Sequence, residues 1–304
     1  MLPILQPLSG TDIPDFLTIG HVTRDMLPEG GFSLGGTVTY AALTASRLGL
    51  ATAIVTSADE QLSSELPAHL PGIGLAVRPS PQTTTFTNLY QDGFRTQYLR
   101  ALAEPPRFED VPAVWRDAPI ILLGPIAQEI SSDFVMGFPR RPERPGTLLA
   151  ATPQGWLRRW DSNGLVSATP WVDAEKTLPL LDVLILSHDD LLPLTDRSRE
   201  KADAILSRWS LLLHLLLATD GRHGATLFQH GQPEHFPPYS TIEIDPTGAG
   251  DVFAASFLYH LSQHKDPRSA MQFANCAASF SVEQVGVGGI PALEMVMSRM
   301  KNWE

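Results

Sequence analysis

Residues 245–251, with the sequence Asp-Pro-Thr-Gly-Ala-Gly-Asp, constrain the fold of this chain more than any other stretch. The alternating apolar segment 239–244 leads into them and predicts a short strand. Pro246 ends any strand ladder because it has no N–H group to donate. Apolar side chains then recur at helical spacing from Phe253 to Leu261, which predicts a helix that starts at once.

The turn between the predicted strand and helix carries only small residues, at Gly248, Ala249 and Gly250. Such a turn lets an anion approach bare backbone N–H groups, and the N-terminus of the helix adds partial positive charge. Asp251 follows in the first helical turn, at the mouth of this anion site. The ordinary alternative is that Asp251 only caps the helix or interacts with its dipole.

The chain is acidic, since 22 Lys and Arg residues against 33 Asp and Glu residues give a net charge of −11. Such a chain is a poor partner for nucleic acids and for anionic membranes. With 304 residues, of which 43% are hydrophobic, it can bury a large core. The single cysteine, Cys276, excludes an intrachain disulfide, and its Ala-rich helical surroundings predict a small apolar core residue.

The sequence shows no segment typical of export or of a membrane span. The first basic residue is Arg24, so the N-terminus lacks the charged start of a signal peptide. The longest apolar runs, near residues 178–186 and 211–218, are too short or too interrupted to cross a bilayer. Cysteine poverty also suits a reducing compartment. We therefore expect a cytoplasmic protein.

Strand and helix patterns alternate along the chain. Helices are predicted at residues 38–48, 58–70 and 131–137. Buried strands are predicted at residues 15–19, 51–56, 120–123, 147–151, 183–186 and 211–219. This alternation is typical of a doubly wound, mostly parallel sheet. No repeat, low-complexity tract or long linker appears, so we expect residues 1–304 to form a single α/β domain.

Two inserted segments predict a small β lid. Residues 83–90 and 94–99 are β-rich runs around a turn with Asp-Gly, which is a hairpin signal. The glycine-rich segment 30–36 indicates tight turns or close approach of the backbone to a ligand. Its residues 32–34 are placed beside the hairpin, so the lid spans about residues 30–36 and 83–100. An ordinary loop and edge hairpin are the alternatives.

Polar residues follow several predicted strands, and open α/β sheets bind ligands at the carboxyl ends of their strands. Asp25 ends one such cluster, Ser187 and Asp190 belong to a second, and residues 219–224 form a glycine-containing turn. Each is also an ordinary cap or turn when taken alone. Residues 152–160 carry Trp and Arg side chains, for which lining a site and packing on the surface are the two alternatives, and we favour packing. A P-loop and a dinucleotide-binding glycine motif are absent from the sequence.

The run Asp-x-Thr-Gly-Ala-Gly-Asp-x-Phe resembles the C-terminal signature of the PfkB carbohydrate kinases, which have the ribokinase-like fold. Residues 35–42 and 47–49 resemble the N-terminal signature, Gly-Gly-x-x-x-Asn-x-Ala followed by Arg-Leu-Gly. The chain departs from this signature at Tyr40, where the family has the Asn of its sugar site. The resemblance extends from Gly20 to Pro291 and includes features of the inositol-kinase branch.

This resemblance implies a role for each matching residue. Asp251 corresponds to the base that deprotonates the acceptor hydroxyl, with Gly248, Ala249 and Gly250 as the anion hole. The residues at the acceptor site are Asp25, Gly35, Gly36 and Tyr40. The residues on the nucleotide side are Ser187, Thr219, Gly221, Gly224 and Asn275. Asp190 matches the Glu that organises Mg²⁺ through water, and the residues beside a monovalent cation are Asp245, Thr247, Val282 and Gly286.

The resemblance therefore implies an ATP-dependent phosphotransferase with Mg²⁺ as cofactor and K⁺ as an activating ion. Its acceptor would be a hydroxyl of a small neutral sugar or of a cyclitol such as myo-inositol, because paired carboxylates repel a phosphorylated substrate. A nucleoside or vitamin-precursor kinase on the same fold is the alternative enzyme. A second alternative is a protein that is not an enzyme but a regulator that binds sugar or nucleotide. Neither a nucleic acid nor a membrane is an expected partner, and the resemblance allows a homodimer formed through the lid.

Overall fold

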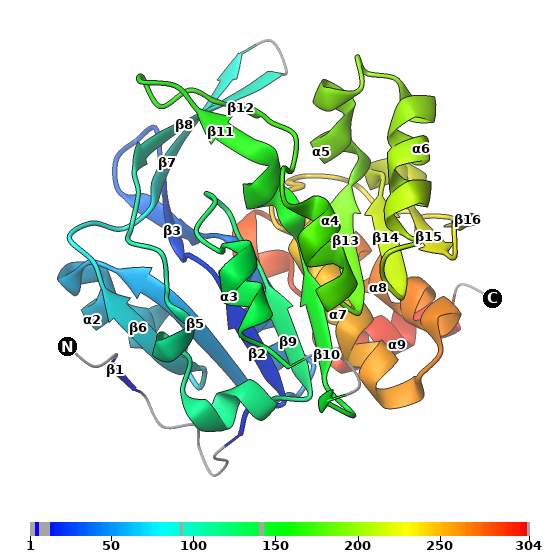
Figure 1. Cartoon of the computed structure of the whole chain (residues 1–304), viewed down its shortest axis with the longest axis horizontal. Helices are drawn as coiled ribbons and strands as arrows, with labels where there is room; N and C mark the ends of the chain where they lie inside the picture. The colour runs from blue at the N-terminus through cyan, green and yellow to red at the C-terminus, as the bar shows by residue number, and fades with distance from the viewer. Residues whose placement is uncertain (1–3, 6–12, 92–93, 140–142, 303–304) are drawn as a thin grey trace.

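The computed structural model describes residues 4–5, 13–91, 94–139 and 143–302. Its main sheet contains β1 (Ile4–Leu5), β2 (Phe16–Ile19), β5 (Thr52–Ala58), β6 (Gly74–Pro79), β9 (Ile120–Leu123), β10 (Leu148–Ala151), β13 (Val183–Ser187), β14 (Leu215–Thr219), β15 (Ala225–Gln229) and β16 (Gln232–Phe236). Their order is β1-β6-β5-β2-β9-β10-β13-β14-β15-β16 (Figure 1). The pairs from β6 to β14 are parallel, and the outer strands β1, β15 and β16 pair antiparallel. The prediction of a mostly parallel sheet is therefore confirmed.

Helices cover both faces of this sheet, as Figure 1 shows. They are α1 (Thr37–Arg47), α2 (Glu60–His69), α3 (Ser132–Met136), α4 (Ala174–Thr177), α5 (His188–Leu191), α6 (Arg199–Trp209), α7 (Ala249–His264), α8 (Pro267–Ser281) and α9 (Leu293–Lys301). The core on one face contains apolar residues of α3, α4 and α6. The core on the other face contains those of α1, α2, α7 and α8. Because both faces are covered, the central strands are continuous apolar runs, as parallel strands commonly are.

The carboxyl ends of the parallel strands lie at one edge of the sheet. Ile19 of β2 is in register with Leu123 of β9, and Ser187 of β13 is in register with Thr219 of β14. Gly124 then donates its N–H to the Ile19 carbonyl at 2.8 Å. The polar residues that follow these strands in the sequence are thus brought to the same edge, which is where ligands bind in open α/β sheets.

A separate four-stranded sheet forms the lid. It contains β3 (Thr23–Met26), β4 (Phe32–Gly35), β7 (Thr85–Gln91) and β8 (Phe94–Ala101), in the order β4-β3-β7-β8. The predicted hairpin and lid are therefore present, and the turn at residues 92–93 lies outside the described residues. One detail differs from the prediction, because β3 lies between β4 and the hairpin. Residues 23–26 carry no clear strand signal, because Arg24 and Asp25 interrupt the apolar pattern of β3.

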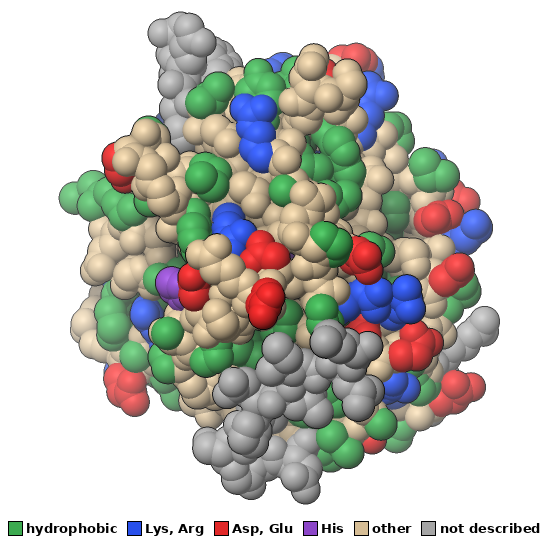
Figure 2. Space-filling model, turned by 90° about the vertical axis from the view of Figure 1, so that its left-hand side faces the viewer, with side chains coloured by type: hydrophobic (Ala, Val, Ile, Leu, Met, Phe, Trp, Pro, Cys, Tyr) green, Lys and Arg blue, Asp and Glu red, His purple; other side chains and the backbone are tan. Residues whose placement is uncertain are grey.

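Polar contacts attach the lid to the main sheet. The Thr84 hydroxyl lies 2.8 Å from His21 Nδ1, and His21 Nε2 lies 3.1 Å from the Glu104 carbonyl oxygen. Arg24 of β3 also forms an ion pair with Asp59, the N-cap residue of α2. Figure 2 shows the side of the molecule that contains α2 and β6, where basic and acidic side chains lie next to one another. The pair of Arg24 with Asp59 thus joins a lid strand to α2 of the main domain.

A second hairpin, β11 (Arg158–Trp160) and β12 (Val166–Ala168), extends this lid and was not predicted. Its turn joins β8, because the Leu99 N–H donates to the Gly164 carbonyl at 2.8 Å and Tyr98 forms a bridge with Leu165. The backbone approaches so closely that a Cβ at Gly164 would lie 2.2 Å from the Leu99 carbonyl oxygen. The hairpin therefore depends on a glycine at this turn.

Two strand predictions are wrong in part. Residues 239–244 are irregular, and the preceding strand is β16, which ends before Pro237 and Pro238 because proline has no N–H to donate. Ile242 and Ile244 are 80% and 62% exposed, so their alternation does not reflect a buried face. The strand predicted at 211–219 begins only at Leu215, after a turn. Among the described residues, none of the helices has the length and apolarity needed to cross a bilayer.

Candidate active site

Residues 245–251 form the predicted turn into a helix. Gly248 is the N-cap of α7 and has a φ of 78°, a left-handed conformation that favours glycine. A Cβ at this position would lie 2.1 Å from Cδ1 of Tyr40, so the Tyr40 ring packs directly on the loop. Gly250 is exposed, and a Cβ there would meet no atom within 4 Å. The loop is thus covered by Tyr40 on one side and open on the other.

The residues predicted as the anion hole lie in and before the first turn of α7. The Ala249 N–H donates to the Pro246 carbonyl at 3.2 Å, which closes the turn. The next amides, of Gly250 and Asp251, belong to the helix N-terminus and so have no partner within the helix. These amides and the helix dipole favour an anion at this end of α7.

Asp251 lies in this first turn and is partly buried. The side chain of Thr37, the first residue of α1, hydrogen-bonds to its carboxylate. The pKa of Asp251 is raised to about 6, mainly by burial and also by the charge of Asp190, while Thr37 and the charge of Arg158 oppose the rise. A carboxylate that titrates close to neutral pH is better suited to accept a proton than an ordinary aspartate.

Close packing of backbone segments brings Thr37 and Asp251 together. A Cβ at Gly124, directly after β9, would lie 2.5 Å from Cγ2 of Thr37. Gly36, the N-cap of α1, has a φ of 89°, and a Cβ there would lie 2.4 Å from the His21 carbonyl oxygen. The N-termini of α1 and α7 therefore meet at the carboxyl end of β9.

Asp190 lies beside Asp251 at the N-terminus of α5. Its Oδ2 accepts the Ser187 N–H at 2.9 Å, and the Ser187 hydroxyl accepts the Asp189 N–H at 3.2 Å. The two side chains thus form a capping box. The pKa of Asp190 is raised by burial, while the Ser187 N–H, the charge of Arg158 and a hydrogen bond from Gln154 oppose this. Ser187, predicted on the nucleotide side, is occupied as a helix cap.

Arg158 lies close to the predicted site residues, although the sequence favoured packing on the surface for it. Its positive charge lowers the pKa of both Asp190 and Asp251, so its guanidinium lies near both carboxylates. The expectation of surface packing is wrong for Trp156, which is buried in the core and stacks on Trp171 with ring centroids 4.5 Å apart. Gln154 of the same segment hydrogen-bonds to Asp190. Two adjacent arginines gave no signal for which of them faces inward.

The residues predicted for the acceptor gather under the lid. Asp25 of β3 is opposite Ser33 of β4, and its carboxylate accepts the Thr23 hydroxyl at 3.3 Å. A Cβ at Gly35 would lie 2.3 Å from Oδ2 of Asp25, so this position needs glycine. Burial raises the pKa of Tyr40, and the charges of Asp245, Asp25 and Asp251 raise it further. The Tyr40 hydroxyl therefore stays protonated and lies among acidic groups.

Apolar side chains line the inner side of the lid. Phe86 and Leu99 of the lid hairpin pack with Ile126 and Ala127, which follow β9. Trp160 and Val166 of the second hairpin pack against the same cluster. The carboxylate of Glu129 accepts N–H groups of His21, Ile126 and Ala127 at 2.7–3.0 Å, which fixes the loop after β9. A small acceptor would thus lie between this apolar cluster and the carboxylates.

The residues predicted for the nucleotide side lie at the ends of β13 and β14, in the turn before β15, and on α8. Gly221 and Gly224 bound the short turn that follows Thr219, and Asp220 in this turn pairs with Arg199 at 2.9 Å. A Cβ at Gly224 would lie 2.2 Å from the Phe236 carbonyl oxygen.

Asn275 of α8 holds the segment that follows β16. Its side chain is buried, and its Nδ2 donates to the Phe236 and Pro237 carbonyls at 3.3 and 3.0 Å. Both N–H groups of this amide are therefore used within the protein. Asn275 thus has a structural contact, and its role in binding the nucleotide stays a prediction.

The residues predicted for a monovalent cation lie close together. Asp245 accepts the Thr247 N–H and the Gly286 N–H, each at 2.9 Å, one on each carboxylate oxygen. The N–H groups of Ile244 and Asp245 both donate to the Val282 carbonyl, at 2.7 and 3.1 Å. A cation at the Val282 carbonyl would compete with these two bonds.

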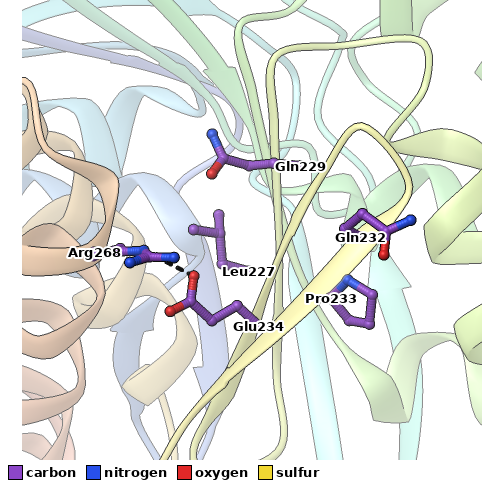
Figure 3. A pocket seen from close by; sticks show the side chains of 6 residues that line it. All are labelled: Leu227, Gln229, Gln232, Pro233, Glu234 and Arg268. Carbon is purple, nitrogen blue, oxygen red and sulfur yellow. Dashed lines mark ion pairs between the residues drawn. The ribbon is translucent and has the colours of Figure 1, made fainter.

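A hollow of about 360 Å³ lies elsewhere, between the β15–β16 hairpin and α8 (Figure 3). Its lining residues are Leu227, Gln229, Gln232, Pro233, Glu234 and Arg268. Glu234 and Arg268 form an ion pair across it at 3.0 Å. The hollow contains none of the predicted catalytic residues, and we do not assign the reaction to it.

Comparison with known proteins identifies the family of the C-terminal part of the chain. The sequence profile of the pfkB family carbohydrate kinase matches residues 162–293, which include residues 245–251. These residues belong to the pfkB family. The predicted family is therefore confirmed for these residues.

Curated relatives match parts of the chain. Fructokinase-2 of Oryza sativa subsp. japonica is 30% identical over 171 residues, which are 52% of this chain and 50% of the relative. Ribokinase of Bacillus subtilis is 39% identical over 77 residues, which are 25% of this chain and 26% of the relative. The chain thus spans about half the length of Fructokinase-2 and less of the ribokinase.

Solved structures match nearly the whole chain. A pyrophosphate-dependent kinase in the ribokinase family, complexed with a pyrophosphate analog and myo-inositol, has a TM-score of 0.78 and 23% identity, over 93% of this chain and 99% of that one. Arabidopsis thaliana ribokinase, complexed with ribose and ATP, has a TM-score of 0.71 and 21% identity, over 95% of this chain and 99% of that one. The predicted ribokinase-like fold is therefore confirmed.

Proposed function

We propose that this protein is a kinase that transfers the terminal phosphoryl group of ATP to a hydroxyl of a small neutral sugar or cyclitol. The observation that carries this proposal is the position of Asp251. Its carboxylate, with a pKa raised to about 6, lies in the first turn of α7 beside backbone amides that can bind an anion. A base next to an anion site is the arrangement that phosphoryl transfer to a hydroxyl requires.

Asp251 would act as the general base. Its carboxylate takes the proton of the acceptor hydroxyl while the oxygen attacks the terminal phosphorus, and the bond from phosphorus to the bridging oxygen of the donor breaks. The amides of Gly250 and Asp251 stabilise the negative charge that develops on the phosphoryl oxygens. The lid and its apolar cluster keep water from taking the place of the acceptor.

Mg²⁺ would be held mainly by the donor phosphates. No group of three His, Cys, Asp or Glu side chains that would hold a metal ion is found in the part of the chain that the structure describes. Mg²⁺ commonly uses one or two carboxylates together with phosphates and waters, and Asp190 fits this role. Its Oδ2 is bound by the Ser187 N–H, so water-mediated contact is the simplest arrangement. The ion would neutralise charge on the phosphates.

The acceptor would be neutral and rich in hydroxyl groups. Asp25 and Asp251 are both acidic, and the charges of Asp25, Asp245 and Asp251 all act on Tyr40 between them. A substrate that carries its own phosphate would be repelled by this cluster, whereas hydroxyl donors would be bound by it. This argument favours a free cyclitol or monosaccharide over a sugar phosphate.

Pyrophosphate is a second candidate donor. One structural neighbour is a pyrophosphate-dependent kinase complexed with myo-inositol. In this chain, both N–H groups of Asn275 are used by the Phe236 and Pro237 carbonyls, so this residue offers no donor to a nucleobase. Pyrophosphate contains no nucleobase, so a phosphoryl donor of this kind would not need a contact with Asn275. The assay therefore compares ATP with pyrophosphate.

The test measures kcat/KM for myo-inositol, ribose, fructose, fructose 6-phosphate and adenosine, with ATP and with pyrophosphate, in the presence of Mg²⁺. We expect transfer to a neutral sugar or cyclitol, and a loss of kcat of about 100- to 10,000-fold in Asp251→Asn, since a general base contributes in that range. Preference for adenosine would favour the nucleoside kinase instead. Binding of a sugar without transfer, unchanged in Asp251→Asn, would indicate a regulator.

A further inference from the structure

The second hairpin places one of its two arginines inside the site. Along β11, Arg158 and Trp160 are partly buried and Arg159 between them is exposed, as expected for the alternation of a strand. Trp160 packs on the apolar cluster of the lid, so Arg158 faces the same side of the strand. Arg158 is held in place through its backbone, because it pairs with Ala168 and Gln128 donates to its carbonyl at 2.5 Å.

The segment before β11 leads Arg158 to the ends of the main strands. Residues Pro153–Leu157 form a 3₁₀ helix that contacts both β13 and α5. Gln154 of this segment hydrogen-bonds to Asp190, and the charge of Arg158 acts on both Asp190 and Asp251. Arg158 therefore lies near the two carboxylates between which a phosphoryl group would pass.

We propose that Arg158 is a catalytic residue whose guanidinium contacts the oxygens of the phosphoryl group during its transfer. This inference rests on the proposed kinase function. Asp251 and Asp190 are both acidic, and a donor phosphate adds further negative charge to the same space. Backbone amides balance part of this charge, and a guanidinium adds two parallel N–H donors that match the geometry of phosphate oxygens.

The hairpin also links Arg158 to the lid. Its turn is joined to β8 through Leu99 and Gly164, and Trp160 and Val166 pack on Phe86 and Leu99 of the lid. Arg158 thus belongs to a hairpin that extends the lid, under which the acceptor would bind. The packing that positions the lid therefore also positions the strand that carries Arg158.

The test compares Arg158→Ala with Arg159→Ala, which removes the neighbouring exposed arginine of the same strand. We expect Arg158→Ala to lower kcat by about 100- to 1,000-fold, the range for loss of one donor to a transition-state anion. Arg159→Ala should stay near wild type. Added guanidinium ion should restore part of the activity of Arg158→Ala and leave Arg159→Ala unchanged. Equal kcat in Arg158→Ala and wild type would overturn the proposal.

A binding measurement separates this proposal from the kinase proposal. Pyrophosphate with Mg²⁺ is titrated into wild type and both variants by calorimetry. We expect the dissociation constant to rise about tenfold or more in Arg158→Ala, because a charge-assisted contact is lost. If no acceptor is phosphorylated, the kinase proposal fails. The pyrophosphate titration by itself still supports or rejects contact between Arg158 and phosphate. Equal affinity in the three proteins, or no binding to wild type, would reject it.

Circular dichroism and thermal melting of the same samples exclude misfolding. Arg158→Lys is a second variant that keeps the positive charge on a long flexible side chain but not the two parallel donors. We expect it to keep pyrophosphate binding better than Arg158→Ala and to recover little of kcat. Full kcat in Arg158→Lys would show that charge alone suffices, and would contradict a fitted guanidinium contact.

Discussion

The acid limb of the pH–rate profile tests Asp251 as the base. Its pKa is raised from 3.8 to about 6, mainly by burial. A base must be ionised to accept a proton, and at a pKa of about 6 roughly one tenth of Asp251 is ionised at pH 5 and roughly nine tenths at pH 7. We therefore expect kcat/KM to fall about tenfold from pH 7 to pH 5. An ordinary aspartate would be largely ionised at both values.

The variant Thr37→Val should shift the acid limb of the profile to higher pH. The Thr37 hydrogen bond lowers the pKa of Asp251, so its loss should shift the limb to higher pH. Valine keeps the methyl group that lies against Gly124. Thr39→Val is the matched control on the same helix, because the Thr39 hydroxyl donates to the Gly35 carbonyl at 2.6 Å instead.

The assay follows phosphorylated acceptor at saturating donor between pH 5 and pH 8, with thermal melts at each pH to confirm that the protein stays folded. A limb centred near pH 4 would show that burial does not tune Asp251 and would refute the assignment. A shift of equal size in Thr37→Val and Thr39→Val would also refute it, because the effect would then arise from general loosening of α1.

Two further predictions concern the loop before α7. Gly248→Ala should lower the free energy of unfolding by about 1–3 kcal/mol, since the position has a φ of 78° and its Cβ would meet the Tyr40 ring. Chemical denaturation measures this change. Gly250→Ala is the control that should be unaffected, because a Cβ there has open space. K⁺ should raise kcat more than Na⁺ or Li⁺ if a cation fixes the loops that Asp245 joins; equal rates in the three chloride salts would remove this idea.

Most of the sheet could be predicted because strands that are buried on both faces are apolar along most of their length. β2, β9 and β13 are continuous apolar runs, and each is followed by glycine or a polar cluster that marks its carboxyl end. The same reasoning failed for residues 239–244. Their alternation resembles a strand, but Pro237 and Pro238 separate them from β16, and the N–H of Ile244 finds a loop carbonyl, of Val282, instead of a strand partner.

Within the site, the sequence indicated residues with local signals and missed those placed by long-range pairing. Asp251 stands in a turn whose small residues reveal an anion site by themselves. Arg158 has no such signal, because Arg158 and Arg159 are adjacent and chemically alike. Pairing of β11 with β12, and packing of Trp160 on the lid, decide which one faces the carboxylates. The packing of Trp160 on the lid joins segments far apart in the chain, so no local pattern encodes which arginine faces inward.

Glycines show why the site needs the whole fold to be understood. A Cβ at Gly35 would collide with the Asp25 carboxylate, one at Gly124 with Thr37, and one at Gly248 with Tyr40. In each pair the missing Cβ of the glycine leaves the space that the neighbouring side chain occupies. The glycine is therefore needed for close packing as well as for its backbone conformation. The sequence shows the gaps but not the residues that fill them. Replacing such a glycine would therefore displace a carboxylate, a hydrogen-bond donor or the wall of the anion loop, and activity should fall even where the fold survives.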